Sequence, residues 1–153
     1  MNRTGQFILL VDDNPDDVEI TLMAFRKCNI ANEVVVVHDG QEALDYLHGT
    51  GAWEGRNCLA MPNIILLDLN LPKVAGLQVL RRIRADAKTK LLPVVILTTS
   101  TEESDLFSSY DLGVNSYVRK PVEFEQFVEA VRQLGVYWLS VNERPPLAKE
   151  PAR

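Results

Sequence analysis

The chain has 153 residues, of which 46% are hydrophobic and 24% charged, and its formal net charge is −5 at neutral pH. A chain of this length is typical of one domain whose core folds without disulfide staples. The negative charge argues against nucleic acid or an anionic membrane as a partner. There is no apolar run of about 18 residues and no signal-peptide core. With only two cysteines, Cys28 and Cys58, we expect reduced thiols in a cytoplasmic protein.

Strands and helices are predicted to alternate through the first half of the chain. The apolar run 7–11 predicts a strand, and Asn14 and Pro15 then supply the cap and first position of a helix that reaches about Cys28. In the first turn of this helix, Asp16 and Asp17 are interpreted as partners of the helix dipole rather than metal ligands. The next expected elements are a strand of four valines, a short helix, an irregular connection and a third strand, over residues 34–37, 41–48, 49–63 and 64–68.

The second half repeats the alternation. Apolar residues recur every three positions after Gly76, which predicts a helix. Residues 94–97 and 116–119 are predicted strands, and the helix between them ends at Gly113, a typical C-terminal glycine. A last helix is predicted over residues 124–139. The segment 141–153 contains three prolines and is expected to be an extended or disordered tail.

This alternation predicts the fold class. Strands that alternate with helices form a parallel sheet covered by helices on both faces. We expect one α/β domain over residues 6–140, with five strands in the flavodoxin-like, doubly wound order 2-1-3-4-5. Ligands of such sheets bind beyond the carboxyl ends of the strands, where the first and third strands are neighbours. Asp12, Asp13 and Asp68 would meet at that point.

Polar side chains at these predicted strand ends suggest a site for a metal ion and a phosphoryl group. Carboxylates about 4 Å apart repel by roughly 4 kcal/mol at an effective dielectric constant of 20, so we expect a cation among them. Hard oxygen ligands favour Mg²⁺ or a similar divalent ion. Lys120 would add a fixed positive charge and Thr98 a hydroxyl, a set that suits a phosphoryl group. Two carboxylates on the metal would leave a third in position to attack phosphorus, and Asp68 is the predicted nucleophile.

Five motifs together resemble those of response-regulator receiver domains such as the chemotaxis regulator, over about residues 7–139. They are Leu9-Leu10-Val11-Asp12-Asp13, Leu66-Leu67-Asp68, Leu71-Pro72 with Gly76, Leu97-Thr98, and Lys120-Pro121. The resemblance implies a phosphoacceptor in a two-component phosphorelay, phosphorylated by a sensor histidine kinase. A closer resemblance, to single-domain regulators of phytochrome-type kinases, rests on Asn14-Pro15-Asp16-Asp17, the loop before Pro62, Thr98-Thr99-Ser100, and Asn115-Ser116-Tyr117 with Tyr137-Trp138-Leu139.

The resemblance also implies a metal site. Asp13 and Asp68 correspond to the direct carboxylate ligands of the family, and Asp12 to the residue that acts mainly through a metal-bound water. The backbone carbonyl of Asn70 corresponds to a third protein ligand.

Further roles follow from the same resemblance. The Thr98 hydroxyl would move toward the phosphoryl group, Lys120 would pair with that group, and Tyr117 would turn inward when Thr98 moves. The Lys120–Pro121 peptide bond is expected to be cis. Thr99 stands where the family has a small residue, which narrows access to the site.

The end of the last helix suggests self-association. Residues 136–139 carry more apolar surface than one helix face buries against its own core. We therefore expect a homodimer through the fourth helix, fifth strand and fifth helix, with Tyr137, Trp138 and Leu139 in the interface. Phosphorylation would act through a change of conformation or oligomeric state, and the protein would not be a turnover enzyme.

Three other functions compete with this hypothesis. A haloacid-dehalogenase-type phosphatase also uses an aspartate at a strand end, but it needs a second aspartate where Asn70 stands. A flavodoxin-like electron carrier would need a phosphate-binding first loop, and Asp12 and Asp13 would repel a phosphate. The third alternative is a receiver-like protein-binding module that is never phosphorylated.

Overall fold

The computed structural model describes residues 6–57 and 60–146. The strands are β1 (Phe7–Val11), β2 (Glu33–Val37), β3 (Ile64–Leu67), β4 (Val94–Thr98) and β5 (Ser116–Arg119). The helices are α1 (Pro15–Lys27), α2 (Gly40–His48), α3 (Gly76–Ala85), α4 (Glu103–Asp111) and α5 (Phe124–Val136). A 3₁₀ turn at Gly51–Trp53 lies in the long connection before β3, and a π-helical turn at Tyr137–Val141 follows α5.

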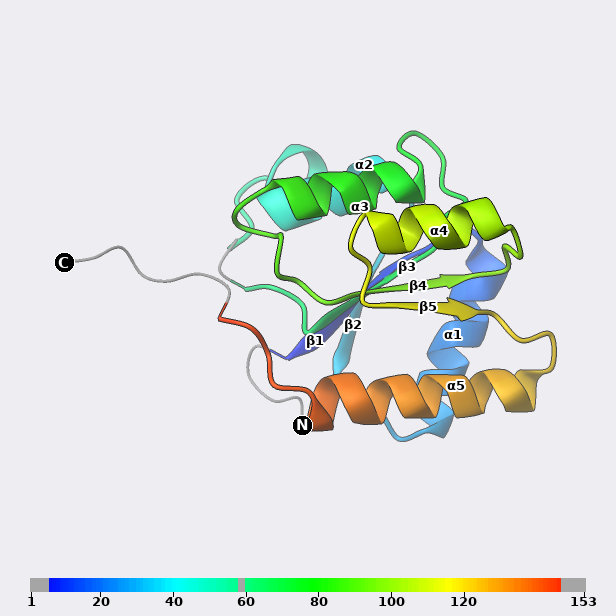
Figure 1. Ribbon diagram of the computed structural model, residues 1–153. Coiled ribbons are helices and arrows are strands. Elements are labelled where there is room, and N and C mark those ends of the chain that lie inside the picture. Colours follow the sequence, from blue (N-terminus) through cyan, green and yellow to red (C-terminus); the bar gives the residue numbers. More distant parts are fainter. Residues whose placement is uncertain (1–5, 58–59, 147–153) are drawn as a thin grey trace.

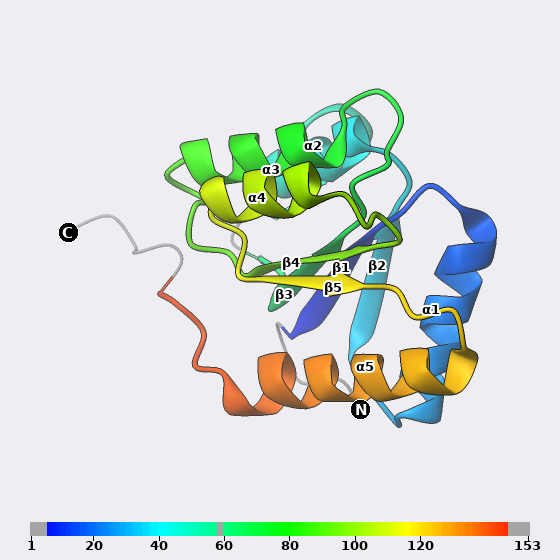
Figure 2. The same cartoon turned by 45° about the vertical axis from the view of Figure 1, so that its right-hand side comes forward.

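The strands form one parallel sheet in the order β2-β1-β3-β4-β5. Helices α1 and α5 cover one face, and α2, α3 and α4 cover the other (Figure 1). Strand β5 forms an edge of the sheet between α4 and α5 (Figure 2). The predicted α/β fold and its strand order are confirmed.

The apolar strand residues divide between two cores. Alternate side chains of a strand point to opposite faces of a sheet. Leu9 and Ile65 accordingly pack toward α2 and α3, while Leu10 and Leu66 pack toward α1 and α5, and all four are almost completely buried. Burial on both faces explains why the central strands are continuous apolar runs, and it places their first polar residues beyond the carboxyl ends.

The end of the last helix differs from the prediction. Helix α5 stops at Val136, and the chain continues as the wider turn Tyr137–Val141 instead of a regular helix to residue 139. The wider turn leaves Trp138 and Leu139 packed on the α1–α5 core while Tyr137 remains exposed.

The predicted tail and the cysteines are only partly described. The Arg144 guanidinium donates a hydrogen bond to the Met61 carbonyl (3.0 Å), so the chain just beyond Val141 contacts the domain body. Residues 147–153 and Cys58 lie outside the described residues, and the domain boundary at residue 140 stays a prediction. Cys28 is a free thiol. None of the helices in residues 6–57 and 60–146 is long and apolar enough to cross a bilayer.

Gly40 lies where the loops after β2 and β3 meet. Its N–H donates to the Pro72 carbonyl (3.4 Å), and a Cβ at this position would overlap the Val74 carbonyl oxygen. A larger residue would therefore push the β3–α3 loop away.

We expect Gly40→Ala to lower the free energy of unfolding by about 1–3 kcal/mol, because overpacking forces the backbone to shift. Gln41→Ala, at the next position and exposed, should change it by no more than about 0.5 kcal/mol. Urea denaturation followed by circular dichroism measures both. Equal stability of the two variants would contradict this assignment.

Candidate functional site

Backbone hydrogen bonds carry the sheet pairing one residue past the strands and so fix the site. The Asp12 N–H donates to the Val37 carbonyl (3.1 Å), and the Asp68 N–H donates to the Val11 carbonyl (3.0 Å). The Lys120 N–H donates to the Thr98 carbonyl (2.7 Å). These residues therefore stand side by side at one edge of the sheet, as the sequence predicts for parallel strands.

The Lys120 ammonium lies at the centre of this edge. Its Nζ is 2.9 Å from Asp12 Oδ2, 3.4 Å from Asp68 Oδ2 and 3.3 Å from Asp17 Oδ2. The side chains of Lys120 and Asp12 are 8% and 2% exposed. Three carboxylates and one ammonium leave a net charge of −2 when all are ionised.

Burial shifts the proton equilibria of this cluster. Loss of hydration raises the pKa of the Asp12 carboxyl, against the opposing effect of its hydrogen bond with Lys120. Burial alone would lower the pKa of Lys120, but the hydrogen bond from Lys120 to Asp12 and the charges of the three carboxylates raise it above its ordinary value. Lys120 is therefore a permanent cation at neutral pH.

Thr98 links the cluster to α4 and β5. Its fully buried hydroxyl donates to Asp68 Oδ1 (3.2 Å) and accepts the Ser100 N–H (3.3 Å). The Ser100 hydroxyl donates to Asp105 Oδ2 on α4 (2.7 Å), and the Tyr117 hydroxyl donates to the Ser100 carbonyl (3.4 Å). Tyr117 is half-buried and packs on the core. A movement of Thr98 would therefore alter hydrogen bonds that reach both α4 and β5.

The remaining predicted metal ligands lie at the rim. Asn70 donates its backbone N–H to Asp68 Oδ1 (3.1 Å), and this hydrogen bond holds the start of the β3–α3 loop against the Asp68 carboxylate. Asp13 is exposed, and its carboxylate is not among the three that converge. Thr99 is exposed and lines a cleft of about 180 Å³ beside Lys120.

The predicted cis bond is wrong. The described residues contain no cis peptide bond, so Lys120–Pro121 is trans. The trans form is the intrinsically favoured one for X–Pro bonds, and the Lys120 ammonium reaches all three carboxylates from it.

Reasoning from the sequence missed Asp17 as a member of the cluster. Asp17 follows the Asn14 cap by three residues, and its N–H donates to the Asn14 side chain (3.2 Å). This position in the first turn of α1 is equally suited to a dipole partner. No local signal tells which way the carboxylate points, so the contact with Lys120 emerges only from the packing of α1 against α5 and the sheet.

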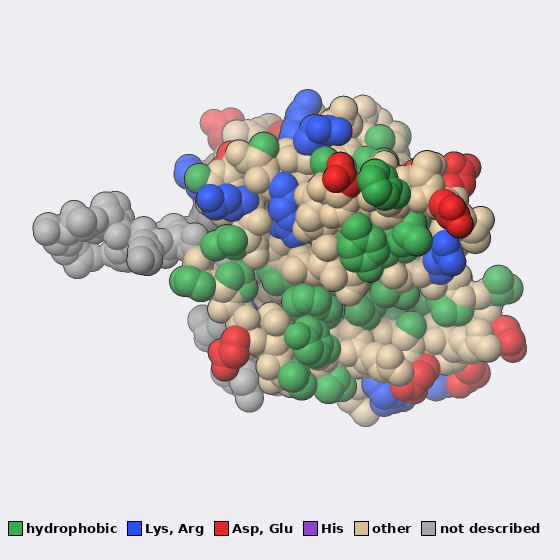
Figure 3. All heavy atoms as spheres, in the orientation of Figure 1, with side chains coloured by type: hydrophobic (Ala, Val, Ile, Leu, Met, Phe, Trp, Pro, Cys, Tyr) green, Lys and Arg blue, Asp and Glu red, His purple; other side chains and the backbone are tan. Residues whose placement is uncertain are grey.

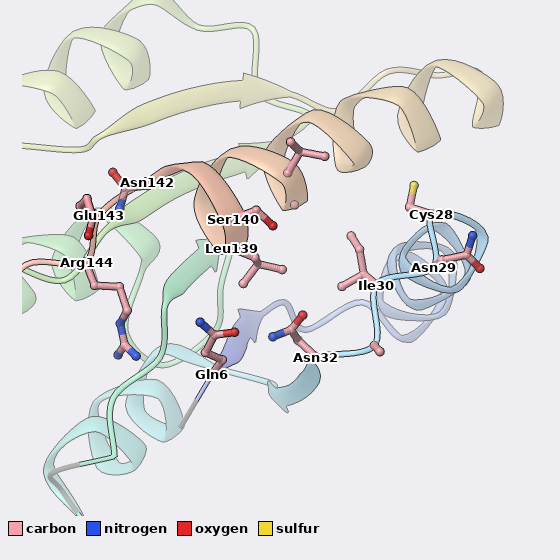
Figure 4. A pocket seen from close by; sticks show the side chains of 13 residues that line it. Gln6, Cys28, Asn29, Ile30, Asn32, Leu139, Ser140, Asn142, Glu143 and Arg144 are labelled. Carbon is pink, nitrogen blue, oxygen red and sulfur yellow. The ribbon is translucent and has the colours of Figure 1, made fainter. Parts of the chain in front are cut away.

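The three predicted interface residues face different grooves. Tyr137 and Trp138 stack edge to face, with ring centroids 4.9 Å apart, and line a groove beside β5. Leu139 instead lines a groove of about 740 Å³ between the α1–β2 turn and the segment after α5 (Figure 4). This second groove is built from residues such as Ile30, Asn32 and Arg144, and it includes none of the acidic cluster.

The acidic cluster fits a divalent cation. One carboxylate oxygen from each of Asp12, Asp17 and Asp68 lies within 4.8 Å of the others. Oxygen donors and a net charge of −2 suit Mg²⁺ or Mn²⁺ better than softer metals, which prefer sulfur and nitrogen ligands.

The family model of the response regulator receiver domain matches residues 8–132. The chain belongs to the response regulator receiver domain family. The predicted resemblance is confirmed, and the family assignment sets aside the phosphatase and the electron carrier.

Several of the similar proteins are response regulators, and some of them are regulators of phytochromes or bacteriophytochromes. Response regulator Rcp1 of Synechocystis sp. is 36% identical over 138 residues, covering 90% of this chain and 92% of Rcp1. Its Mn²⁺-bound crystal structure has a TM-score of 0.82, covering 91% of this chain and 98% of that one. The phosphorylated cyanobacterial phytochrome response regulator RcpA is 41% identical with a TM-score of 0.83, covering 91% and 97%. The bacteriophytochrome response regulator AtBRR is 55% identical with a TM-score of 0.72, covering 90% and 97%.

Asp12→Asn should reveal the cost of burying the Asp12 charge. The folded-state pKa of Asp12 is raised, so folding favours the protonated carboxyl group. The stability that protonated Asp12 contributes is complete below the ordinary pKa of 3.8 and is lost as the pH rises through the raised pKa. Without divalent ions, we expect Asp12→Asn to melt several degrees above the wild type at pH 7.5 and to lose this advantage as the pH falls toward 4. Thermal melts in EDTA measure the difference. An advantage that grows toward acid pH would contradict the assignment.

Proposed function

We propose that this receiver domain accepts a phosphoryl group on Asp68 from the phosphohistidine of a sensor histidine kinase. The observation that carries the proposal is the set of contacts around Asp68, whose carboxylate meets the Thr98 hydroxyl and the Lys120 ammonium at 3.2 and 3.4 Å. The similarity to RcpA and AtBRR supports a phytochrome-type kinase as the donor.

The transfer needs little beyond alignment and charge compensation. An oxygen of the Asp68 carboxylate attacks phosphorus, and the new O–P bond forms as the P–N bond to the donor imidazole breaks. The imidazole leaves with the electron pair. Lys120 and Thr98 are placed to contact the phosphoryl oxygens once they are bound to Asp68, since both side chains already touch its carboxylate.

The metal ligands of this proposal are Asp12, Asp13, Asp68 and the backbone carbonyl of Asn70. Asp12 and Asp68 are buried at the ends of β1 and β3, and the exposed residues Asp13 and Asn70 follow them closely in the chain. A bound Mg²⁺ supplies positive charge that offsets the repulsion between the carboxylates and the phosphoryl oxygens.

The proposed signal leaves the site through Thr98. When its hydroxyl turns to the phosphoryl group, the hydrogen bond from the Ser100 N–H is lost. The Ser100 contacts with Asp105 and Tyr117 are then free to rearrange, which changes the α4–β5–α5 face.

The chain acts in this proposal as a cytoplasmic phosphoacceptor and not as a turnover enzyme. Its own acyl phosphate is lost when a water oxygen attacks phosphorus and the bond to Asp68 breaks, which restores the carboxylate and releases inorganic phosphate.

Intact-mass spectrometry tests the acceptor. With Mg²⁺ and acetyl phosphate, we expect the wild type to gain one phosphoryl group and Asp68→Asn to gain none, because the amide cannot act as the nucleophile. Asp111→Asn, which alters an exposed aspartate on α4, should be phosphorylated like the wild type. A wild type that gains nothing from acetyl phosphate or from a phytochrome-type kinase would favour the module that is never phosphorylated.

We also propose that two copies associate through the α4–β5–α5 face. Hydrophobic side chains gather on this face (Figure 3), where Phe107, Tyr110 and Tyr137 are 72%, 52% and 47% exposed. Trp138 lies beside Tyr137, and Leu139, the third predicted interface residue, lines the neighbouring groove. Exposed aromatic residues in one patch are typical of protein interfaces.

Phe107→Glu should weaken this dimer at least tenfold, because it places a charge in the centre of an apolar contact. Met23→Glu, which introduces the same charged residue in place of an exposed apolar residue on α1, is the matched control. Size-exclusion chromatography with light scattering, before and after phosphorylation, measures the dimer. A Phe107→Glu dimer as tight as that of the control would exclude this face.

A further inference from the structure

Lys120 has three carboxylate partners, and one of them, Asp17, is not a ligand of the proposed metal site. Asp12 and Asp68 belong to the metal site, but Asp17 lies on α1 and contributes an oxygen 3.3 Å from the same ammonium. The Asp17 side chain is 37% exposed, whereas those of Asp12 and Asp68 are 2% and 10% exposed. Asp17 therefore holds Lys120 from the solvent side of the cluster.

The start of α1 keeps Asp17 in place. The Asn14 side chain accepts the Asp16 and Asp17 N–H groups (2.9 and 3.2 Å), and the Thr21 hydroxyl donates to the Asp17 carbonyl (2.8 Å). Asp17 stands on a capped helical turn, while the Lys120 ammonium is carried by a long, flexible side chain. Of the two, Lys120 is the partner that can move.

A divalent ion and the ammonium compete for the same carboxylates. The Lys120 Nζ contacts Oδ2 of Asp12 and Oδ2 of Asp68, and a metal ion bound by these residues would repel it at this range. Without another partner, the buried ammonium would lose its compensating charge whenever the metal bound. Asp17 offers such a partner from α1, an element that carries neither Asp12 nor Asp68.

We infer that Asp17 is a positioning residue that retains the Lys120 ammonium on the α1 side when a divalent cation occupies Asp12 and Asp68. The ammonium and the metal ion then share the site, each with its own carboxylate, and both are in place for an incoming phosphoryl group. This inference rests on the proposed metal site, and it assigns Asp17 to Lys120 instead of to the metal.

A double-mutant cycle tests the inference. The Mg²⁺ dissociation constant is measured by isothermal titration calorimetry for the wild type, Asp17→Asn, Lys120→Met and the double variant. We expect Asp17→Asn to weaken Mg²⁺ binding about fivefold, the equivalent of a partly exposed ion pair, because Lys120 then opposes the metal. In the Lys120→Met background the same change should weaken binding less than about twofold, since no ammonium needs a partner.

Asp16→Asn is the matched control, because it removes one negative charge from the exposed side of the same helical turn. An Asp17→Asn effect no larger than that of Asp16→Asn would overturn the inference. Equal weakening in both Lys120 backgrounds would also overturn it and would make Asp17 a metal ligand. Lys120→Gln, with the same expected sign, replaces Lys120→Met if that variant does not fold.

Phosphorylation of Asp17→Asn separates this inference from the proposed function. Asp17→Asn keeps Asp68 and should still gain one phosphoryl group from acetyl phosphate at saturating Mg²⁺. A gain without thermodynamic coupling between Asp17 and Lys120 would refute the positioning role alone, whereas a wild type that gains nothing would refute the acceptor function.

Discussion

The contact between the Lys120 ammonium and three carboxylates is the interaction on which this molecule depends. Carboxylates from the ends of β1 and β3 and from the first turn of α1 lie within 3.4 Å of the Lys120 nitrogen, which comes from the end of β5. Carboxylates this close repel each other by several kcal/mol at an effective dielectric constant of about 20, so the cluster is tolerable only because a cation lies within it. The same excess of negative charge attracts a divalent ion.

The parallel sheet holds these residues in register. Asp12 and Lys120 are 108 positions apart in the chain, yet the N–H groups at the strand ends continue the pairing and leave them little freedom. Gly76 contributes from the far side of the β3–α3 loop, because a Cβ there would overlap the Asp68 carbonyl oxygen. Thr98 then connects this rigid edge to α4 through Ser100, which gives a local event a route to a distant surface.

Much of this arrangement could be predicted, and the failures have identifiable causes. The strand-end positions of Asp12, Asp68, Thr98 and Lys120 follow from where apolar runs stop. The course of the chain after Val136 does not, since it depends on how that segment fits its neighbours. The cis bond expected at Lys120–Pro121 came from the family resemblance alone, and the structure has the intrinsically favoured trans form. The contact between Asp17 and Lys120 was missed as well, because the helix dipole already explains a carboxylate in the first turn of a helix.

The sequence by itself therefore determined the alternating elements, their parallel arrangement and the edge of the sheet that carries chemistry, because these depend on apolar periodicity and on the handedness of connections between successive elements. Only the tertiary structure decided which carboxylates share the ammonium and which aromatic side chains share a face. These contacts join segments that are distant in the chain and depend on the direction in which each side chain points. Packing, burial and charge compensation in three dimensions set that direction.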